Sequence, residues 1–425
     1  MSNGIKIMNR QMVAVGAILI QLCLGAIYAW SVYTKILVEA GWSKAETQIV
    51  FSAGLALFAI SMIIAGRFMP KVGPRKLTIL SGIVLGIGYI LAGLLGGQNF
   101  WVTFFFVGIV GGCGIGIGYV VPIAVGMRWF PDKKGLITGL AVAGFGFGAT
   151  LWMTLADSLG KIGGGHLLTH LGLSQTFIVY GIAYIILVLI GSKWMVFPPD
   201  GWKPEGWTPP EAKPGTSSGL VDFMSGEMLR TPQFYMIFFT FLFGASAGLM
   251  SIGLMKLFPM EAMQAKGIDK ESASYIATMA MGVCFALLNG FGRIIWGMIS
   301  DKMGRKLSII IMLATQGIFV ILFQWMAGTP LTLYLFAMLI GFNFGGTLAL
   351  FPAITADTFG TKNIGMNYGW VFLAYGVGGI FGPIMGGMLG DMKNFPLAFT
   401  ISGILCLVAV CIIAFIKPPV KKMTS

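Results

Sequence analysis

The sequence is poor in charge and in the side chains that do acid–base, metal or phosphate chemistry. Only 10% of its 425 residues are charged, against about 25% in an ordinary soluble protein. No Walker motif for ATP is present, and the two histidines, His166 and His170, have no third ligand nearby. We therefore expect no enzyme, no metal site, no cofactor and no ATP-driven pump.

The cysteines also lack a pattern. There are five, and all fall in apolar stretches without metal-ligand spacing or a disulfide framework. They are Cys23, Cys113, Cys284, Cys406 and Cys411. Their usage therefore says little about a redox compartment.

What the chain does have is apolar sequence in long runs. Its composition is 56% hydrophobic, and its 62 glycines suit closely packed membrane helices. We count twelve segments long enough to cross a bilayer. They are Met12–Ile36, Thr47–Ala65, Leu77–Leu95, Trp101–Val125, Leu136–Leu155, Thr176–Val196, Phe234–Leu257, Ser272–Ser300, Leu307–Met326, Leu331–Leu350, Gly365–Gly390 and Phe395–Ile416. The sequence predicts an all-α membrane protein with twelve transmembrane helices.

A break rich in Pro, Gly and Ser divides these segments six and six. We predict an amino-terminal half at 1–197, a cytoplasmic linker at 198–232 and a carboxy-terminal half at 233–425. Related loops that begin at Gly66 and Gly297, 231 residues apart, follow the second and the eighth segment. Two parallel six-helix halves are the architecture of one large class of transporters, with the substrate site between them near the midplane.

Lys and Arg are distributed unevenly between the two sides of such a protein. If the amino terminus is cytoplasmic, 20 of the 28 lie on the cytoplasmic side and seven on the outer side, and Arg293 lies within a segment. This bias fits the positive-inside rule with both termini in the cytoplasm. We expect a multi-pass protein of the cell membrane that works as a monomer in the lipid bilayer. The topology explains the net charge of +13 without nucleic acid.

One cation, Arg293, lies inside an apolar segment. It precedes Asp301, at the polar end of the segment, by eight residues, or about 12 Å, which is close to the midplane of a core about 30 Å thick. All fifteen Asp and Glu lie in loops or near helix ends. Because an unpaired buried cation is costly, we expect a small anionic substrate to be its counter-ion. The alternatives are solvation by Asn289, tyrosines and water, or snorkelling to the interface.

Large side chains recur at a comparable depth. Tyr28 lies in the first segment, Tyr119 nine residues before Arg128, and Tyr375 about ten residues into the eleventh segment. Phe344 and Leu348 are expected in the last turns of the tenth segment. Tyrosines could donate hydrogen bonds to a carboxylate and wall a site, although each one singly is more often a packing or interfacial residue.

The loop after the eighth segment reads Gly297-x3-Asp301-Lys302-x-Gly304-Arg305-Lys306. It is similar to the cytoplasmic-loop signature of the major facilitator superfamily, which implies the fold of that superfamily and a role for the loop in conformational switching. The copy at Gly66 has Pro70 where the family has Asp. We therefore expect the amino-half loop to lack the usual charge lock.

More narrowly, the chain resembles the oxalate–formate antiporter family and the related monocarboxylate transporters. The matching blocks are Arg128–Gly135, Ser225–Phe234, Asn289–Arg293, Phe351–Gly360 and Asn367–Gly369. The resemblance implies that Arg293 binds the substrate carboxylate. It also matches Tyr28, Tyr119 and Phe344 to wall positions of the central site.

Two departures from these relatives narrow the expected substrate. Oxalate exchangers carry a second cation, a lysine, where this chain has Tyr375, and one cation matches one carboxylate. The animal transporters pair the arginine with an aspartate where this chain has Asn289. We therefore expect secondary transport of a small monocarboxylate such as lactate, pyruvate or formate.

The coupling is expected to be proton symport, with the proton moving with the substrate or through water and tyrosines. The alternative is anion exchange of the oxalate–formate type. A transporter-like carboxylate sensor would need an output domain, which the short linker and tail do not suggest.

Overall fold

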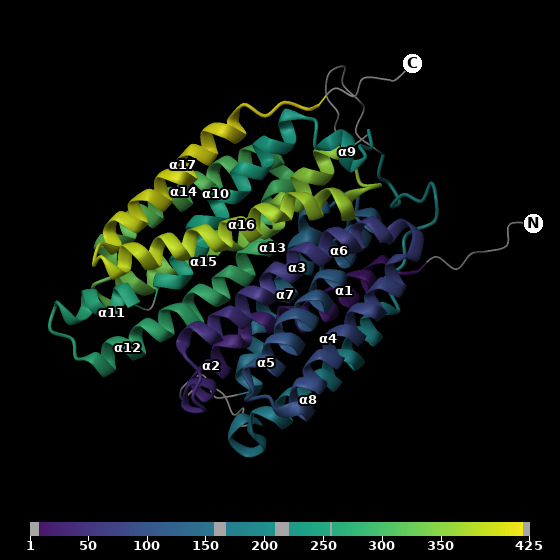
Figure 1. The fold of residues 1–425 in the computed structure, drawn as a ribbon. Helices are drawn as coiled ribbons and strands as arrows, with labels where there is room; N and C mark the ends of the chain where they lie inside the picture. The colour runs from purple at the N-terminus through teal and green to yellow at the C-terminus, as the bar shows by residue number, and fades with distance from the viewer. Residues whose placement is uncertain (1–7, 157–166, 209–220, 256, 420–425) are drawn as a thin grey trace, which may run out of the picture.

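The computed structural model describes residues 8–156, 167–208, 221–255 and 257–419. Within these ranges it contains twelve helices that are long and apolar enough to cross a membrane. They form two groups of six, one from each half of the chain, packed side by side (Figure 1). The predicted all-α fold with twelve spans in two halves is confirmed.

The first half contains several continuous helices and two that change character along their length. Its elements are α1 (Arg10–Leu24), η1 (Gly25–Ala29), α2 (Trp30–Glu39), α3 (Lys44–Val72), α4 (Pro74–Gly96), α5 (Phe100–Thr103), η2 (Phe104–Gly111), α6 (Gly112–Trp129), α7 (Lys134–Ala156) and α8 (Leu167–Ser192). The first span is thus α1 and α2 joined by the 3₁₀ turn η1. The fourth passes from α5 through the π-helical turn η2 into α6.

The second half has the same order of long helices. Its elements are α9 (Ser225–Met228), α10 (Pro232–Leu254), α11 (Leu257–Gln264), α12 (Lys270–Met279), η3 (Ala280–Phe285), α13 (Ala286–Met303), α14 (Arg305–Met326), α15 (Pro330–Phe359), α16 (Ile364–Asp391) and α17 (Phe395–Ala414). The eighth span is α12 and α13 joined by the π-helical turn η3. Such turns are frequent at functional sites, and η3 ends one turn before Asn289.

Two helices begin with the side-chain caps that their sequences favour. Ser43 and Glu46 form a reciprocal capping box at the start of α3. Asp269 accepts a hydrogen bond of 2.9 Å from the backbone N–H of Ser272 at the start of α12. This bond holds the pKa of the Asp269 carboxyl below its ordinary value.

The tenth span is longer than expected, and this corrects the predicted positions of Phe344 and Leu348. The predicted segment ended at Leu350, but α15 continues through Pro352 to Phe359. Proline is tolerated inside membrane helices because neighbouring groups satisfy the freed backbone atoms. Phe344 and Leu348 therefore lie in the middle of α15 and not in its last turns.

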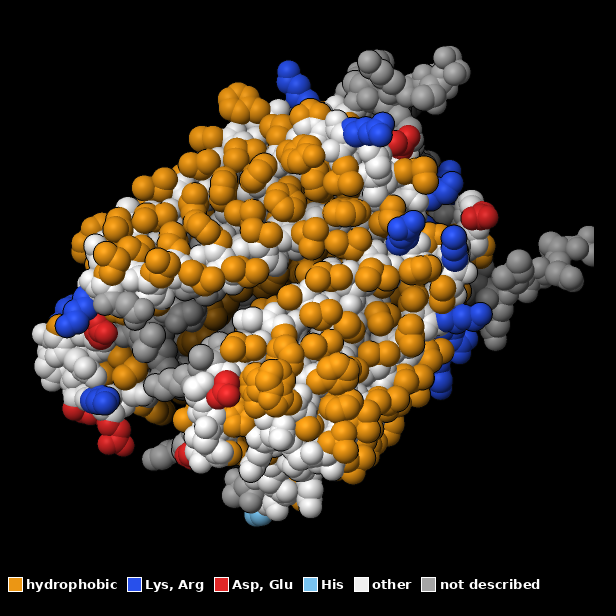
Figure 2. Space-filling view, in the orientation of Figure 1, with side chains coloured by type: hydrophobic (Ala, Val, Ile, Leu, Met, Phe, Trp, Pro, Cys, Tyr) orange, Lys and Arg blue, Asp and Glu red, His pale blue; other side chains and the backbone are white. Residues whose placement is uncertain are grey.

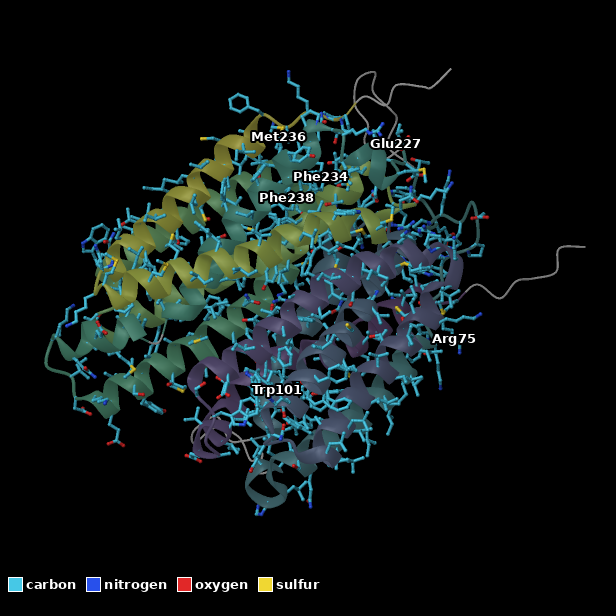
Figure 3. All side chains as sticks on the ribbon, viewed as in Figure 1. Arg75, Trp101, Glu227, Phe234, Met236 and Phe238 are labelled. Atoms are coloured by element: carbon cyan, nitrogen blue, oxygen red, sulfur yellow. The ribbon has the colours of Figure 1, made fainter. Side chains whose placement is uncertain are left out.

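The two halves meet at one end of the molecule and diverge toward the other. The end where they meet carries Arg75 and Glu227, whereas Trp101 lies toward the opposite end (Figure 3). We call the first of these the basic end, because most of the Lys and Arg visible in Figure 2 gather there.

Close approaches of α3 to α16 lie at the basic end and toward the middle of the helices. A Cβ added at Gly66 would lie 2.3 Å from the carbonyl oxygen of Gly365, and one at Gly369 would lie 3.0 Å from the Cα of Ile63. Farther out along α16, a Cβ at Gly387 would meet nothing within 4 Å. Figure 2 shows the resulting hollow between the halves on the side away from the basic end.

Candidate functional site

Arg293 lies on α13 where the two halves meet, and it is only 2% exposed. Its Nε and Nη2 both donate to Oδ1 of Asn289, one turn earlier, at 3.1 and 2.9 Å. Its Nη1 donates to the backbone carbonyl of Val142 on α7, at 2.6 Å. Since α7 belongs to the first half and α13 to the second, the guanidinium joins the two halves.

Glycines on α7 allow this approach. A Cβ at Gly139 would lie 2.3 Å from the carbonyl oxygen of Arg293, and one at Gly146 would lie 3.3 Å from its Cζ. A larger residue at Gly139 would push α7 away from α13. The two glycines therefore let a backbone carbonyl of one half serve as an acceptor for a cation of the other.

The hydrogen bonds of Arg293 leave part of its guanidinium unused. An arginine has five N–H donors, and the bonds to Asn289 and Val142 use three of them. Among the described residues no carboxylate forms a salt bridge with Arg293. A buried cation with spare donors is costly, so the site is suited to an incoming anion.

Four tyrosine hydroxyls interact electrostatically with the positive charge of Arg293. Tyr28 on η1 and Tyr119 on α6 come from the first half, and Tyr368 and Tyr375 come from α16 in the second. The hydroxyls of Tyr28 and Tyr375 are hydrogen-bonded at 2.7 Å. A second bond between the halves therefore lies beside Arg293.

Aromatic rings from both halves pack around these hydroxyls. Phe372 on α16 lies 5.1 Å from Phe58 on α3 and 5.4 Å from Tyr119, centroid to centroid. Phe145 on α7 contacts Tyr119 at 5.2 Å and Tyr28 at 5.3 Å. The cation thus lies in a largely apolar and aromatic setting.

The predicted wall residues on α15 are less central. The ring of Phe344 lies 6.5 Å from that of Tyr375, centroid to centroid, so Phe344 contacts the site through this tyrosine. Leu348 is buried one turn closer to the basic end. The structure thus gathers Arg293, Asn289 and the three predicted tyrosines, and it places the two α15 residues farther out or in the adjoining core.

Sequence reasoning missed four aromatic residues of this site, namely Phe58, Phe145, Tyr368 and Phe372. For two of them a signal existed, because Tyr368 and Phe372 precede Tyr375 by seven and three residues and so share its helical face. No periodicity distinguished Phe58 or Phe145 from other apolar residues of their helices. His166, considered above as a metal ligand, lies outside the described residues.

The predicted switch loop lies at the basic end, between α13 and α14, and there it contacts the start of α7. Both carboxylate oxygens of Asp301 accept hydrogen bonds of 2.8 Å, from the backbone N–H groups of Gly135 and Leu136 in the first turn of α7. A carboxylate at a helix amino terminus is stabilised by the free N–H groups and the helix dipole. Gly297 lies close by, since a Cβ there would be 2.3 Å from the carbonyl oxygen of Gly135.

An ion-pair network surrounds this cap. Arg305 pairs with Asp301 at 2.6 Å and with Asp357 on α15 at 2.9 Å. Lys134, at the start of α7, pairs with Asp357 at 2.9 Å. The cap and the Lys134 pair both cross between the halves, whereas Lys302 is exposed.

The corresponding loop of the first half makes the same turn but has Pro70 in place of the aspartate. Gly73 and Gly304 both have ψ 150, with φ 86 and 87, a conformation that favours glycine. Pro70 is part of α3, and the close approach of Gly66 to Gly365 brings α3 against α16 instead. The basic end is therefore closed by the Asp301 cap and its ion pairs on one side. On the other side it is closed by close backbone packing and by Arg128, which donates a hydrogen bond of 2.7 Å to the carbonyl of Lys362.

The Asp301→Asn protein is expected to open more readily at the basic end. The amide keeps one acceptor for α7 but loses the ion pair with Arg305, and a charge-assisted hydrogen bond is worth about 1.5–3 kcal/mol. Spin–spin distances between labels on the basic ends of α3 and α14 should shift toward longer values. The matched control is Asp269→Asn, because Asp269 caps only its own helix; an equal shift in both proteins would contradict the assignment.

A class of protein follows from this geometry. Twelve apolar helices in two halves, with a buried cation and a cluster of hydroxyls between them, define a multi-pass membrane transporter. Comparison with known proteins specifies the family. The family model of the Major Facilitator Superfamily matches residues 13–277 and 245–425, and the chain belongs to that superfamily.

Three relatives are similar to this chain over most of its length. The MFS-type transporter YhjX of Escherichia coli K12, which is uncharacterised, is 30% identical over 88% of this chain and 86% of its own. The oxalate:formate antiporter of Oxalobacter formigenes is 28% identical over 98% and 94%. Apicoplast pyruvate carrier 1 of Toxoplasma gondii is 24% identical over 84% and 79%.

A solved structure confirms the fold. The fucose:proton symporter FucP of E. coli superposes with a TM-score of 0.67 at 15% sequence identity. The match covers 95% of this chain and 98% of that one.

Proposed function

We propose that this protein is a secondary active transporter of small monocarboxylates of the lactate, pyruvate and formate class. The observation that carries the proposal is Arg293, a cation buried between the halves with two spare N–H donors and no carboxylate partner among the described residues. The planar guanidinium fork matches the two oxygens of a carboxylate. A bound carboxylate would supply both the missing charge and the missing acceptors.

The charge inventory favours a substrate with one carboxylate. Arg293 is the one Lys or Arg among the buried polar residues that the structure describes. A second carboxylate at this depth would meet tyrosine hydroxyls and rings and no second cation. The names of two relatives report oxalate, formate and pyruvate for those proteins, and formate and pyruvate have the single carboxylate that suits this site.

The arrangement of the halves supports alternating access. They are closed at the basic end by the Asp301 cap and the Lys134–Asp357 pair, and they separate toward the opposite end. By the positive-inside rule the basic end, with both termini, is cytoplasmic. A carboxylate would then enter from the outer hollow and leave after the halves rock about the site.

Proton symport is the coupling that we propose, and anion exchange is the alternative. No carboxylate beside Arg293 among the described residues is available to carry a proton, so a proton would travel with the substrate or through the tyrosine hydroxyls and water. The Oxalobacter relative, an antiporter by name, favours the alternative. Only flux measurements discriminate between the two.

Proteoliposomes that contain an internal pH dye test this proposal. Lactate, pyruvate, formate and oxalate are added in turn, with empty liposomes as the control for passive entry of the acids. Protein-dependent internal acidification with a monocarboxylate is expected. Exchange of preloaded labelled anion without acidification would establish the antiporter instead. The absence of both acidification and exchange would contradict the proposal of a carboxylate carrier.

A further inference from the structure

Tyr368 carries a polar group that the fold does not satisfy. Its side chain is fully buried, and its hydroxyl has no hydrogen-bond partner among the described residues. Such a group is costly because it has lost water without gaining a partner. A buried hydroxyl of this kind therefore calls for a partner that arrives from outside the chain.

The position of Tyr368 places that hydroxyl on the basic side of the site. Tyr368 precedes Tyr375 by seven residues on α16, which is about 10 Å along a helix that begins at the basic end. The Arg293 charge acts on the Tyr368 hydroxyl. The Tyr119 hydroxyl from the first half lies near enough to interact with it, but the two do not form a hydrogen bond of normal geometry. The Tyr368 ring packs on Phe372 at 5.7 Å. Tyr368 thus lies within reach of the Arg293 charge, on the cytoplasmic side of the proposed pathway.

We propose that Tyr368 is a substrate-binding residue whose phenol donates a hydrogen bond to the carboxylate that Arg293 holds. This inference rests on the proposed function and adds a second donor to its site. A carboxylate has about four acceptor positions, so the two spare N–H groups of Arg293 leave room for a hydroxyl. This bond would give the buried Tyr368 hydroxyl the hydrogen-bond partner that it lacks among the described residues.

The donors of this site are divided between the halves in a way that gives Tyr368 a distinct task. Arg293, Tyr368 and Tyr375 all belong to the second half, whereas Tyr28 and Tyr119 belong to the first. When the halves rock, a substrate held by Arg293 and Tyr368 stays with the second half. Tyr28 and Tyr119 then move relative to the substrate and close or open its two sides.

The Tyr368→Phe protein tests this inference because the exchange removes one oxygen and keeps the ring. The matched control is Tyr184→Phe on α8. Tyr184 is also fully buried with an unpartnered hydroxyl among the described residues, but it lies against Trp152 and Tyr89 in the first half. Pyruvate and lactate binding to the purified proteins is measured by titration calorimetry, and thermal unfolding is measured without ligand.

We expect Tyr368→Phe to bind the monocarboxylate about tenfold more weakly, with an unfolding temperature equal to or above that of the wild type. Tyr184→Phe should bind as the wild type does. Wild-type affinity in Tyr368→Phe, with binding abolished in Arg293→Ala, would overturn this inference alone. A parallel loss of affinity in both tyrosine variants would assign the effect to packing and also overturn it. A wild-type protein that binds neither acid would overturn the proposed function, and this inference with it.

Discussion

Proteoliposomes that contain Arg293→Ala are expected to take up lactate or pyruvate at less than about 1% of the wild-type rate. Removing one member of a buried charge pair costs about 3–5 kcal/mol, which corresponds to a factor of more than 100. The substrate carboxylate would lose its one buried cation, because no other Lys or Arg among the buried described residues replaces it. Initial rates of labelled substrate uptake provide the measurement.

Two further proteins make this result specific. Arg293→Lys keeps the charge but loses the fork and the bonds to Asn289 and Val142, so we expect an intermediate loss of about 10- to 100-fold. Arg230→Ala removes an exposed arginine near α9 and should transport as the wild type does. Undiminished uptake by Arg293→Ala would exclude Arg293 as the carboxylate site.

The Asn289→Asp protein is expected to become strongly dependent on pH. Oδ1 of Asn289 already accepts two hydrogen bonds from Arg293, so an introduced carboxylate would form an ion pair with the cation and compete with the substrate. At neutral pH the KM for lactate should rise about 10- to 100-fold. As the pH falls, the introduced carboxylate takes up a proton and releases Arg293, so the KM should fall toward that of the wild type.

The measurement is the KM for lactate at a series of external pH values, with Asn289→Ala as the control. Alanine removes the amide without adding a charge, so its KM should rise modestly and by the same factor at every pH. Parallel pH profiles for Asn289→Asp and the wild type would show that position 289 does not control the availability of Arg293.

The position of Arg293 was accessible from sequence for a physical reason. Hydropathy fixes the ends of a membrane helix, and the rise per residue then gives the depth of any side chain within it. A charged residue at the midplane costs so much free energy that it is a candidate functional residue by itself. Asn289, one turn earlier on the same face, followed from helical periodicity. The cap on α7 by Asp301 was not predicted as a contact, although the loop signature singled out the residue.

The contacts across the halves were not accessible in the same way. Tyr28 and Tyr375 are 347 positions apart in sequence, and no local pattern pairs them. Val142 contributes its backbone carbonyl, and every residue type has one, so the identity of the residue did not indicate this role. The α15 residues were misplaced because the predicted segment stopped short of Pro352, which the membrane helix passes through. Packing of one half on the other decides the first two cases, and the tolerance of membrane helices for proline decides the third.

The most direct measurement is the distance between the Arg293 guanidinium and the substrate carboxylate. Protein labelled with ¹⁵N-arginine in lipid bilayers, saturated with pyruvate labelled with ¹³C at C1, gives this distance by dipolar recoupling in solid-state NMR. We expect a coupling that corresponds to about 3.5 Å, as in a bidentate pair, and its loss in Arg293→Lys. No coupling in a saturated sample, or a coupling that persists in Arg293→Lys, would place the carboxylate elsewhere and contradict the proposed site.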